Sequence, residues 1–322
     1  MILSTTHFAS ATGEGDIAVH KWTPHSKPVG VVQFVHGMSE YVLRFEPIAR
    51  FFTEKGYVFC GHDLAGHGES IHNPENKGFF AEKNGWDKLI ADTMQVHKLL
   101  KTEYPDLVHI LYGHSMGSLI ARSCAGRFGK CFDAYIWEST AGPNYALPLG
   151  KLLAQAVLKL RGSHALSKTL NTLVFGPFVA SVKKRRTIFD WLSHDPEVVD
   201  KYLSDPMCGF SFRAAAYCDL FHGVGEVNRR KWALSVPNAP IYIVSGDEDP
   251  VGNFGRGVKK VVNMLLRAGK THIAFQLYHG GRHELHNETF RSEFLKGIEA
   301  FLKSVELKSG SYVHCSEQSS QH

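Results

Sequence analysis

Ser115 stands at the centre of the sequence Gly-His-Ser-Met-Gly, residues 113–117, where a strand is expected to turn into a helix. Residues 108–112 are β-branched, aromatic or otherwise mostly apolar, as in a buried strand, and residues 117–128 carry apolar side chains at helical spacing. A serine on so sharp a turn needs small residues two positions away on either side, and glycine stands at both. Such a turn exposes the serine hydroxyl beside the positive end of a helix, within reach of a base. The pattern therefore predicts that Ser115 is a nucleophile.

A nucleophilic serine of this type needs an acid and a histidine, which follow it in that order along the chain. Residues 241–244 predict a short strand, and the sequence Ser-Gly-Asp-Glu-Asp-Pro follows at residues 245–250. The carboxyl ends of parallel strands are where α/β folds place their site residues. We favour Asp249 as the acid, because Pro250 fixes the turn beyond it and the chain then becomes apolar again. Asp247 stays open as an alternative, because position alone does not separate neighbours in one loop.

The histidine should follow the last strand, which the alternating residues 273–278 predict. His283 is preferred among the 19 histidines, because it comes just after a Gly-Gly turn from which a loop can carry its imidazole toward the serine. His279 is expected to end the strand, and His286 to begin the final helix.

The oxyanion that develops during acyl transfer needs two backbone donors. One is expected to be the N–H of Met116, the residue after the nucleophile, and the other should come from an early strand-to-loop turn. Residues 29–35 are the strongest predicted strand of the chain, and Gly37 beyond it allows a bend that aims the N–H of Met38 inward. An ordinary turn at the end of the strand is the alternative for this second motif.

These motifs resemble those of α/β-hydrolases in the monoglyceride lipase and lysophospholipase group, which are classed beside the serine aminopeptidases of type S33. The resemblance runs from about residue 15 to residue 305 and rests on residues 36–40 with 44–45, 63–70, 113–117, 245–252 and 278–288. It implies that the acid is Asp249 and the base His283. It also implies that Asp63, Gly66 and Gly68 shape a turn near the site.

The resemblance further implies a serine hydrolase that cleaves carboxylic esters through an acyl-enzyme, most closely a monoacylglycerol lipase or lysophospholipase, without metal or cofactor. A serine aminopeptidase would use the same residues but should carry an acidic pocket for the substrate's amino group. A small-ester carboxylesterase is the other enzymatic alternative. A non-catalytic binding protein on this scaffold would be expected to lack a member of the triad, and all members are present. A serine at position 115 argues against epoxide hydrolases and dehalogenases, whose nucleophile is a carboxylate.

The composition is that of an ordinary globular protein, with 322 residues, of which 43% are hydrophobic and 21% charged. A net charge of +5 is too small to predict nucleic-acid binding. The six cysteines show no Cys-x-x-Cys spacing, which favours a reducing compartment. The first residues lack the features of a signal peptide, and no stretch approaches the roughly 20 apolar residues that span a bilayer. These features predict a soluble, cytoplasmic protein and leave its oligomeric state open.

The alternation of strands and helices predicts an α/β-hydrolase core with a mostly parallel, doubly wound sheet, formed by residues 1–140 and 237–306. The alternation stops between them, so residues 141–236 are expected to form an inserted helical cap. The polar residues 307–322 are expected to form a disordered tail.

The expected cap is rich in apolar residues, of which Leu152, Val157, Leu173 and Phe178 are expected to help enclose the acyl chain of a lipid ester. The basic residues 183–186 follow, and they would suit a transient contact between the cap and an anionic membrane surface, where the cytoplasmic protein would then be peripheral. The alternative is that this basic run is simply a solvated face.

Overall fold

A computed structural model describes residues 1–316, with side chains as far as Val305. Its sheet has eight strands in the order β1-β2-β4-β3-β5-β6-β7-β8. The strands are β1 (Ile2–Ala9), β2 (Asp16–Thr23), β3 (Gly30–Val35), β4 (Tyr57–His62), β5 (Val108–His114), β6 (Ala134–Glu138), β7 (Ile241–Gly246) and β8 (Ile273–Tyr278). β2 is antiparallel to both of its neighbours, and the pairs from β4 across to β8 are parallel.

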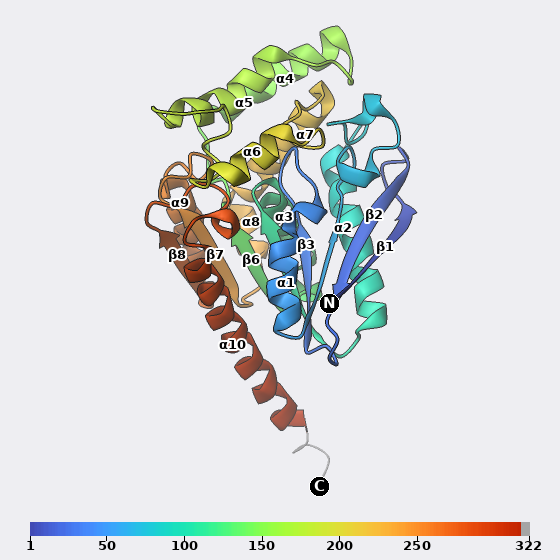
Figure 1. Ribbon diagram of the computed structural model, residues 1–322, viewed down its shortest axis with the longest axis vertical. Helices are drawn as coiled ribbons and strands as arrows, with labels where there is room; N and C mark the ends of the chain where they lie inside the picture. The colour runs from blue at the N-terminus through green and yellow to red at the C-terminus, as the bar shows by residue number, and fades with distance from the viewer. Residues whose placement is uncertain (317–322) are drawn as a thin grey trace.

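Helices cover both faces of this sheet, because neighbouring residues of a strand point to opposite faces. Val31 of β3 belongs to an apolar core that includes α2 (Gly85–Glu103), α3 (Met116–Phe128), α8 (Arg230–Ser235) and α9 (Arg256–Arg267). The next residue, Val32, belongs to a second core formed with α1 (Glu46–Glu54) and α10 (Arg291–Ser316). Figure 1 shows α1 and α10 together on one side of the strands. The predicted architecture, a mostly parallel sheet between two helical layers, is confirmed.

Three local features differ from the sequence predictions. The antiparallel strands β1 and β2 were not predicted; β1 is an edge strand with mostly exposed side chains, so it lacks the apolar alternation that identifies a strand. His286 lies in a short 3-10 turn, Leu285–Asn287, rather than at the start of the final helix, which begins at Arg291. That helix extends to Ser316, beyond the expected start of the tail at residue 307, and residues 317–322 lie outside the described part of the chain.

The chain between β6 and β7 is helical, with α4 (Leu147–Arg161), α5 (Lys168–Ser181), α6 (Pro196–Ser204), α7 (Ala214–Val227) and then α8. In Figure 1, α4 and α5 are the outermost layer, and α6 and α7 lie between them and the carboxyl ends of the parallel strands. Within the described residues, no helix combines the length and apolar character that crossing a membrane requires.

Arg122 of α3 ties this helical segment to the core at two places, its beginning and the end of α7. Its buried guanidinium donates to the carbonyl oxygen of Ala141, where the chain enters the segment, at 2.8 Å. It also donates to the carbonyl oxygen of Val227, where the chain leaves α7, at 2.7 Å. Thr140 and Asn228 accept further hydrogen bonds from the same group.

Candidate active site

Ser115 lies on the turn between β5 and α3, with a positive φ of 53° that is strained for a residue with a side chain. The glycines on either side allow this turn. A Cβ atom on Gly113 would lie 2.3 Å from the carbonyl oxygen of Gly117, and one on Gly117 would lie 2.0 Å from that of Val35. The structure therefore gives the physical reason for both small residues in the Gly-x-Ser-x-Gly sequence.

A chain of hydrogen bonds joins Ser115, His283 and Asp249. His283 Nε2 lies 2.8 Å from Ser115 Oγ, and His283 Nδ1 lies 3.0 Å from Asp249 Oδ1. Because the Asp249 carboxylate can only accept, it holds the imidazole in the tautomer with the proton on Nδ1, which leaves Nε2 free to accept the serine proton. Asp249 is itself buried and accepts further hydrogen bonds from Val251 N and Ser245 Oγ.

Asp247, the alternative acid, lies elsewhere. Its carboxylate accepts from the backbone N–H of Gly280 at 2.7 Å and lies 2.9 Å from Nδ1 of the exposed His279. These contacts tie the loop after β7 to the end of β8 at the surface. The structure thus brings Asp249 to His283 and leaves Asp247 in a turn contact.

The environment of His283 raises its pKa above the usual value of 6.5. Burial alone would lower this pKa, but the adjacent Asp249 carboxylate stabilises the imidazolium more than burial destabilises it. The loop that carries His283 is fixed by a hydrogen bond of 2.6 Å from Ser139 Oγ to the His283 carbonyl. The ring also packs against Trp191, with centroids 5.1 Å apart.

The β3 loop, residues 36–41, passes directly beside Ser115. A Cβ atom on Gly37 would lie 2.9 Å from the Ser115 Cβ. His36 fixes the peptide that joins Gly37 to Met38. Its Nε2 accepts from the Leu64 N–H at 2.9 Å, so Nδ1 carries the proton and donates to the Gly37 carbonyl at 2.8 Å.

Burial keeps His36 neutral, because its pKa is well below the usual value. With the Gly37 carbonyl held on one side, the Met38 N–H of the same planar peptide points the opposite way. Met116, the first residue of α3, has an N–H without a carbonyl partner in its own helix. Met38 and Met116 both line the cavity above Ser115.

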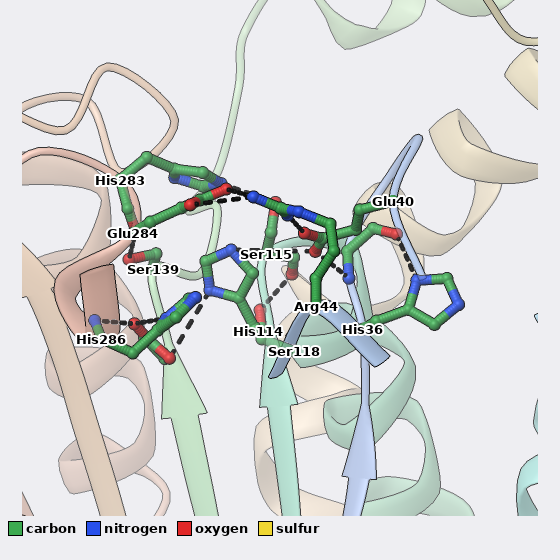
Figure 2. Close-up of polar contacts among 12 residues, drawn as sticks. His36, Glu40, Arg44, His114, Ser115, Ser118, Ser139, His283, Glu284 and His286 are labelled. Atoms are coloured by element: carbon green, nitrogen blue, oxygen red, sulfur yellow. Dashed lines mark hydrogen bonds and ion pairs between the residues drawn. The ribbon is translucent and has the colours of Figure 1, made fainter. Parts of the chain in front are cut away.

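A buried network of charged groups surrounds the site, and sequence reasoning did not predict it (Figure 2). Arg44 forms ion pairs with Glu40 and Glu284, the latter at 3.2 Å. Below them, Glu138 pairs with His286 at 2.8 Å and also accepts from Tyr112. The sequence contains only a weak indication of this network: its charged residues lie within motifs that are otherwise apolar or contain glycine.

Two sets of these side chains have ligand atoms close enough to one another to hold a metal ion. One set is His114, Glu138 and His286, and the other is Glu40, His114 and Glu284. Their carboxylates, however, already have cationic partners. Burial would raise the pKa of Glu138, but His286 and His114 hold it well below its usual value. Burial likewise opposes ionisation of Glu284. The charged groups around it, of which Arg44 has the largest effect, nevertheless lower the pKa of Glu284 to about 2. The network is therefore best described as buried ion pairs that set loop positions.

A cavity of about 520 Å³ opens above Ser115 and His283. Much of its wall is apolar and comes from the chain between β6 and β7, including Leu147, Leu173, Phe175, Phe178, Trp191 and Phe221. Of the residues expected to enclose an acyl chain, Leu173 and Phe178 line it, whereas Leu152 and Val157 do not. Leu152 is 64% exposed, because only part of the apolar face of α4 points to the interior and the rest lies on the outer surface.

The fold and the Ser115–His283–Asp249 geometry define a serine hydrolase of the α/β-hydrolase class. The family described as "Serine aminopeptidase, S33" matches residues 26–290, and the chain belongs to that family.

Relatives with known names are similar over most of their length. The chain is 27% identical to the monoacylglycerol lipase of Mycolicibacterium smegmatis over 310 residues, covering 94% of this chain and 99% of that one. It is also 27% identical to human monoglyceride lipase over 286 residues, covering 88% and 84%. The crystal structure of a thermostable carboxyl esterase from Bacillus coagulans superimposes with a TM-score of 0.89 at 29% identity, covering 95% and 99%. These findings place the chain among serine hydrolases that cleave carboxylic esters.

Proposed function

We propose that this protein hydrolyses monoacylglycerols or lysophospholipids, and that Ser115, His283 and Asp249 are its catalytic triad. One observation carries the proposal: the hydrogen-bonded chain of these residues lies at the floor of a largely apolar cavity of about 520 Å³. A cavity of this size suits a single acyl chain with a small head group. The names of the relatives, monoacylglycerol and monoglyceride lipases, support the same substrate class.

In the proposed reaction, His283 Nε2 takes the proton of Ser115 as its Oγ attacks the ester carbonyl. The negative charge on the carbonyl oxygen is stabilised by the N–H groups of Met38 and Met116. When the tetrahedral intermediate collapses, His283 donates the proton to the departing alcohol. It then deprotonates a water molecule that attacks the acyl-enzyme, and the proton returns to Ser115 as the fatty acid leaves. Asp249 holds the imidazole in place and stabilises the imidazolium at each step.

The aminopeptidase alternative needs a carboxylate that is free to bind a substrate ammonium group. The carboxylates that line the cavity within the described chain are Glu40 and Glu284, and both are bound by Arg44. Neither is available to an amino group unless the Arg44 ion pairs break. This observation favours an ester substrate over a peptide.

We also propose that residues 141–236 act as a cap on a core formed by residues 1–140 and 237–306, in a cytoplasmic protein. The Arg122 contact at Ala141 supports the first of these boundaries, and its contact at Val227 lies at the end of α7, ahead of the second. The cysteines with described side chains are all free, which is consistent with a reducing compartment.

The outer face of α4 is proposed to touch membrane surfaces transiently. Leu149, Leu152 and Leu160 are 57%, 64% and 82% exposed on it, with Lys159 and Arg161 beside them. Exposed leucines with flanking cations suit insertion among anionic head groups. Co-sedimentation with vesicles containing phosphatidylserine should fall for Leu152→Glu; equal co-sedimentation would contradict the contact.

The proposed function is tested with Ser115→Ala. The variant should fold as the wild type does but lose roughly 10⁴-fold or more in kcat on monoacylglycerols, because the covalent route is gone. A screen over monoacylglycerols, lysophospholipids, short p-nitrophenyl esters and aminoacyl amides identifies the preferred class. A fluorophosphonate probe should label Ser115 in the wild type and leave the variant unlabelled. Near-normal turnover by a folded Ser115→Ala protein would end the proposal.

A further inference from the structure

Ser39, the residue after Met38, has a left-handed backbone with φ of 57° and no exposed surface. A residue with a side chain keeps such a conformation only when its surroundings hold it there. Each polar group of Ser39 is in fact bound. Its N–H donates to His67 Nε2 at 3.2 Å, and its Oγ donates to the carbonyl of Phe210 at 2.7 Å.

Four hydrogen bonds join the β3 loop to one part of the helical chain between β6 and β7, residues 196–210, which we call the α6 segment. The Ser39 carbonyl accepts from the Tyr202 hydroxyl at 3.0 Å and from the Gly209 N–H at 3.0 Å. Tyr41 at the other end of the loop donates to Asp205 Oδ2 at 2.8 Å. The sheet alone therefore does not define the conformation of this loop.

Tyr202 reaches the loop by a second route as well. Its ring lies against the Arg44 guanidinium, with 4.7 Å between the guanidinium carbon and the ring centroid. Arg44 is paired with Glu40, and Glu40 Oε1 accepts from the backbone N–H of Gly37 at 2.6 Å. Tyr202 thus acts on backbone groups of Gly37 and Ser39, the residues on either side of Met38 (Arg44 and Glu40 are labelled in Figure 2).

We propose that Tyr202 is a positioning residue for the reaction. Through its contacts with Ser39 and with the Arg44–Glu40 pair, it sets the position of the Met38 N–H, which donates a hydrogen bond to the oxyanion. The inference rests on the proposed function. An oxyanion donor works only when its N–H lies within hydrogen-bonding distance of the oxygen in the transition state. Contacts that hold a strained loop in that geometry therefore act on the chemical step rather than on substrate binding. On this account α4 and α5 supply wall of the substrate cavity, and the α6 segment holds the β3 loop of the catalytic site.

The decisive variant is Tyr202→Phe, which keeps the ring on Arg44 and removes only the hydroxyl that binds Ser39. Its matched control is Tyr217→Phe, since Tyr217 is also buried and donates its hydroxyl to Asn171 at 3.1 Å, away from the β3 loop. Tyr202→Phe should lower kcat about 10-fold with KM unchanged, less than the roughly 100-fold or greater loss when a donor is deleted outright. The inhibition constant of an alkyl trifluoromethyl ketone, which forms a tetrahedral adduct on the serine, should rise by the same factor. Tyr217→Phe should change neither quantity.

Equal kcat values for the folded Tyr202→Phe and Tyr217→Phe proteins would overturn the inference. So would a rise in KM at constant kcat, which would mean that the hydroxyl binds substrate. If Tyr202→Phe does not fold, Tyr41→Phe removes another hydroxyl contact between the loop and the α6 segment, the one to Asp205, and carries the same test. Failure of the proposed function looks different, because the wild-type protein would then hydrolyse no ester and show no labelling of Ser115.

Discussion

His283 lies between a hydroxyl that must lose a proton and a carboxylate that must not gain one. The distances of 2.8 Å to Ser115 and 3.0 Å to Asp249 suit this double role. At the scale of single residues, the neighbouring carboxylates Asp247 and Asp249 differ only in what they face. One is buried against the imidazole, and the other caps a surface turn.

Exchanging each carboxylate for its amide separates the two. Asp249→Asn should reduce kcat by roughly 10³- to 10⁴-fold, because an amide in that place favours the wrong tautomer of His283 and cannot stabilise the imidazolium. Asp247→Asn should leave kcat close to that of the wild type and serves as the matched control. Steady-state kinetics on one ester decide the matter, and the reverse ranking would move the acid to Asp247.

The raised pKa of His283 has a definite consequence for pH dependence. Only the unprotonated imidazole acts as the base, so activity is lost as the pH falls through the His283 pKa. Since that pKa lies above the usual 6.5, kcat/KM should begin to fall already at a pH above 6.5. A profile of kcat/KM against pH on a non-ionising ester measures this limb. A midpoint well below 6.5 would contradict the assigned environment.

At the scale of elements, α4 and α5 supply cavity wall without holding the β3 loop. Leu173 and Phe178 of α5 line the cavity. The hydrogen bonds that join Ser39 and Tyr41 to the chain between β6 and β7 are made with the α6 segment instead. Removal of the outer helices should therefore affect which esters are preferred more than whether esters are cleaved.

Replacing residues 146–182 by a short Gly-Ser linker tests this division. In the intact protein, each methylene buried in the cavity should favour the transition state by about 0.8 kcal/mol, or roughly fourfold in kcat/KM, until the cavity is full. The deletion should flatten this dependence and keep part of the activity on short esters. The comparison is kcat/KM over a series of acyl lengths. A preference for acetyl esters in the intact protein would contradict the lipid substrate and leave the serine hydrolase class untouched.

At the scale of the whole molecule, Arg122 links the core to the helical segment that covers it. Burial of Arg122 lowers its pKa to about 9, and its partners are neutral oxygen atoms at the beginning of that segment and at the end of α7. Arg127 on the same helix forms ion pairs with Asp87 and Glu226 that are partly exposed to solvent.

Arg122→Met should lower the free energy of unfolding by about 3 kcal/mol or more, because several buried acceptors lose a charged donor at once. Arg127→Met is the matched control and should cost only about 0–1 kcal/mol, as solvent-exposed ion pairs do. Urea denaturation of both variants measures the difference. Equal losses of stability would show that Arg122 does not join the two parts in the way described.

Much of the fold and the sharp turn that carries Ser115 could be predicted from sequence, since both depend on local patterns. The apolar runs that became β3 to β7 are short and buried, the run that became β8 is partly buried and alternates, and such patterns identify strands. The elbow at Ser115 was predictable because only glycine fits two residues to either side of it. The position of His283 beyond a strand and a Gly-Gly turn was also visible in the sequence. The exposed edge strand β1 was missed, since its side chains carry no such pattern.

Only the tertiary structure shows that Asp249, and not Asp247, contacts His283, because the two carboxylates differ in direction within a single loop. The same holds for the ion pair of Arg44 with Glu284, which are 240 residues apart in the chain and meet only when their two loops come together over the sheet. The tertiary structure also shows that Leu152 is exposed and that Leu173 lines the cavity. Helical spacing defines the apolar face of a helix but not whether that face packs on the protein or contacts solvent. Finally, the tertiary structure placed Tyr202 on Ser39, a contact between distant segments that no local pattern encodes. Local sequence determines conformation through sterics and periodicity, whereas long-range contacts depend on how the completed elements pack.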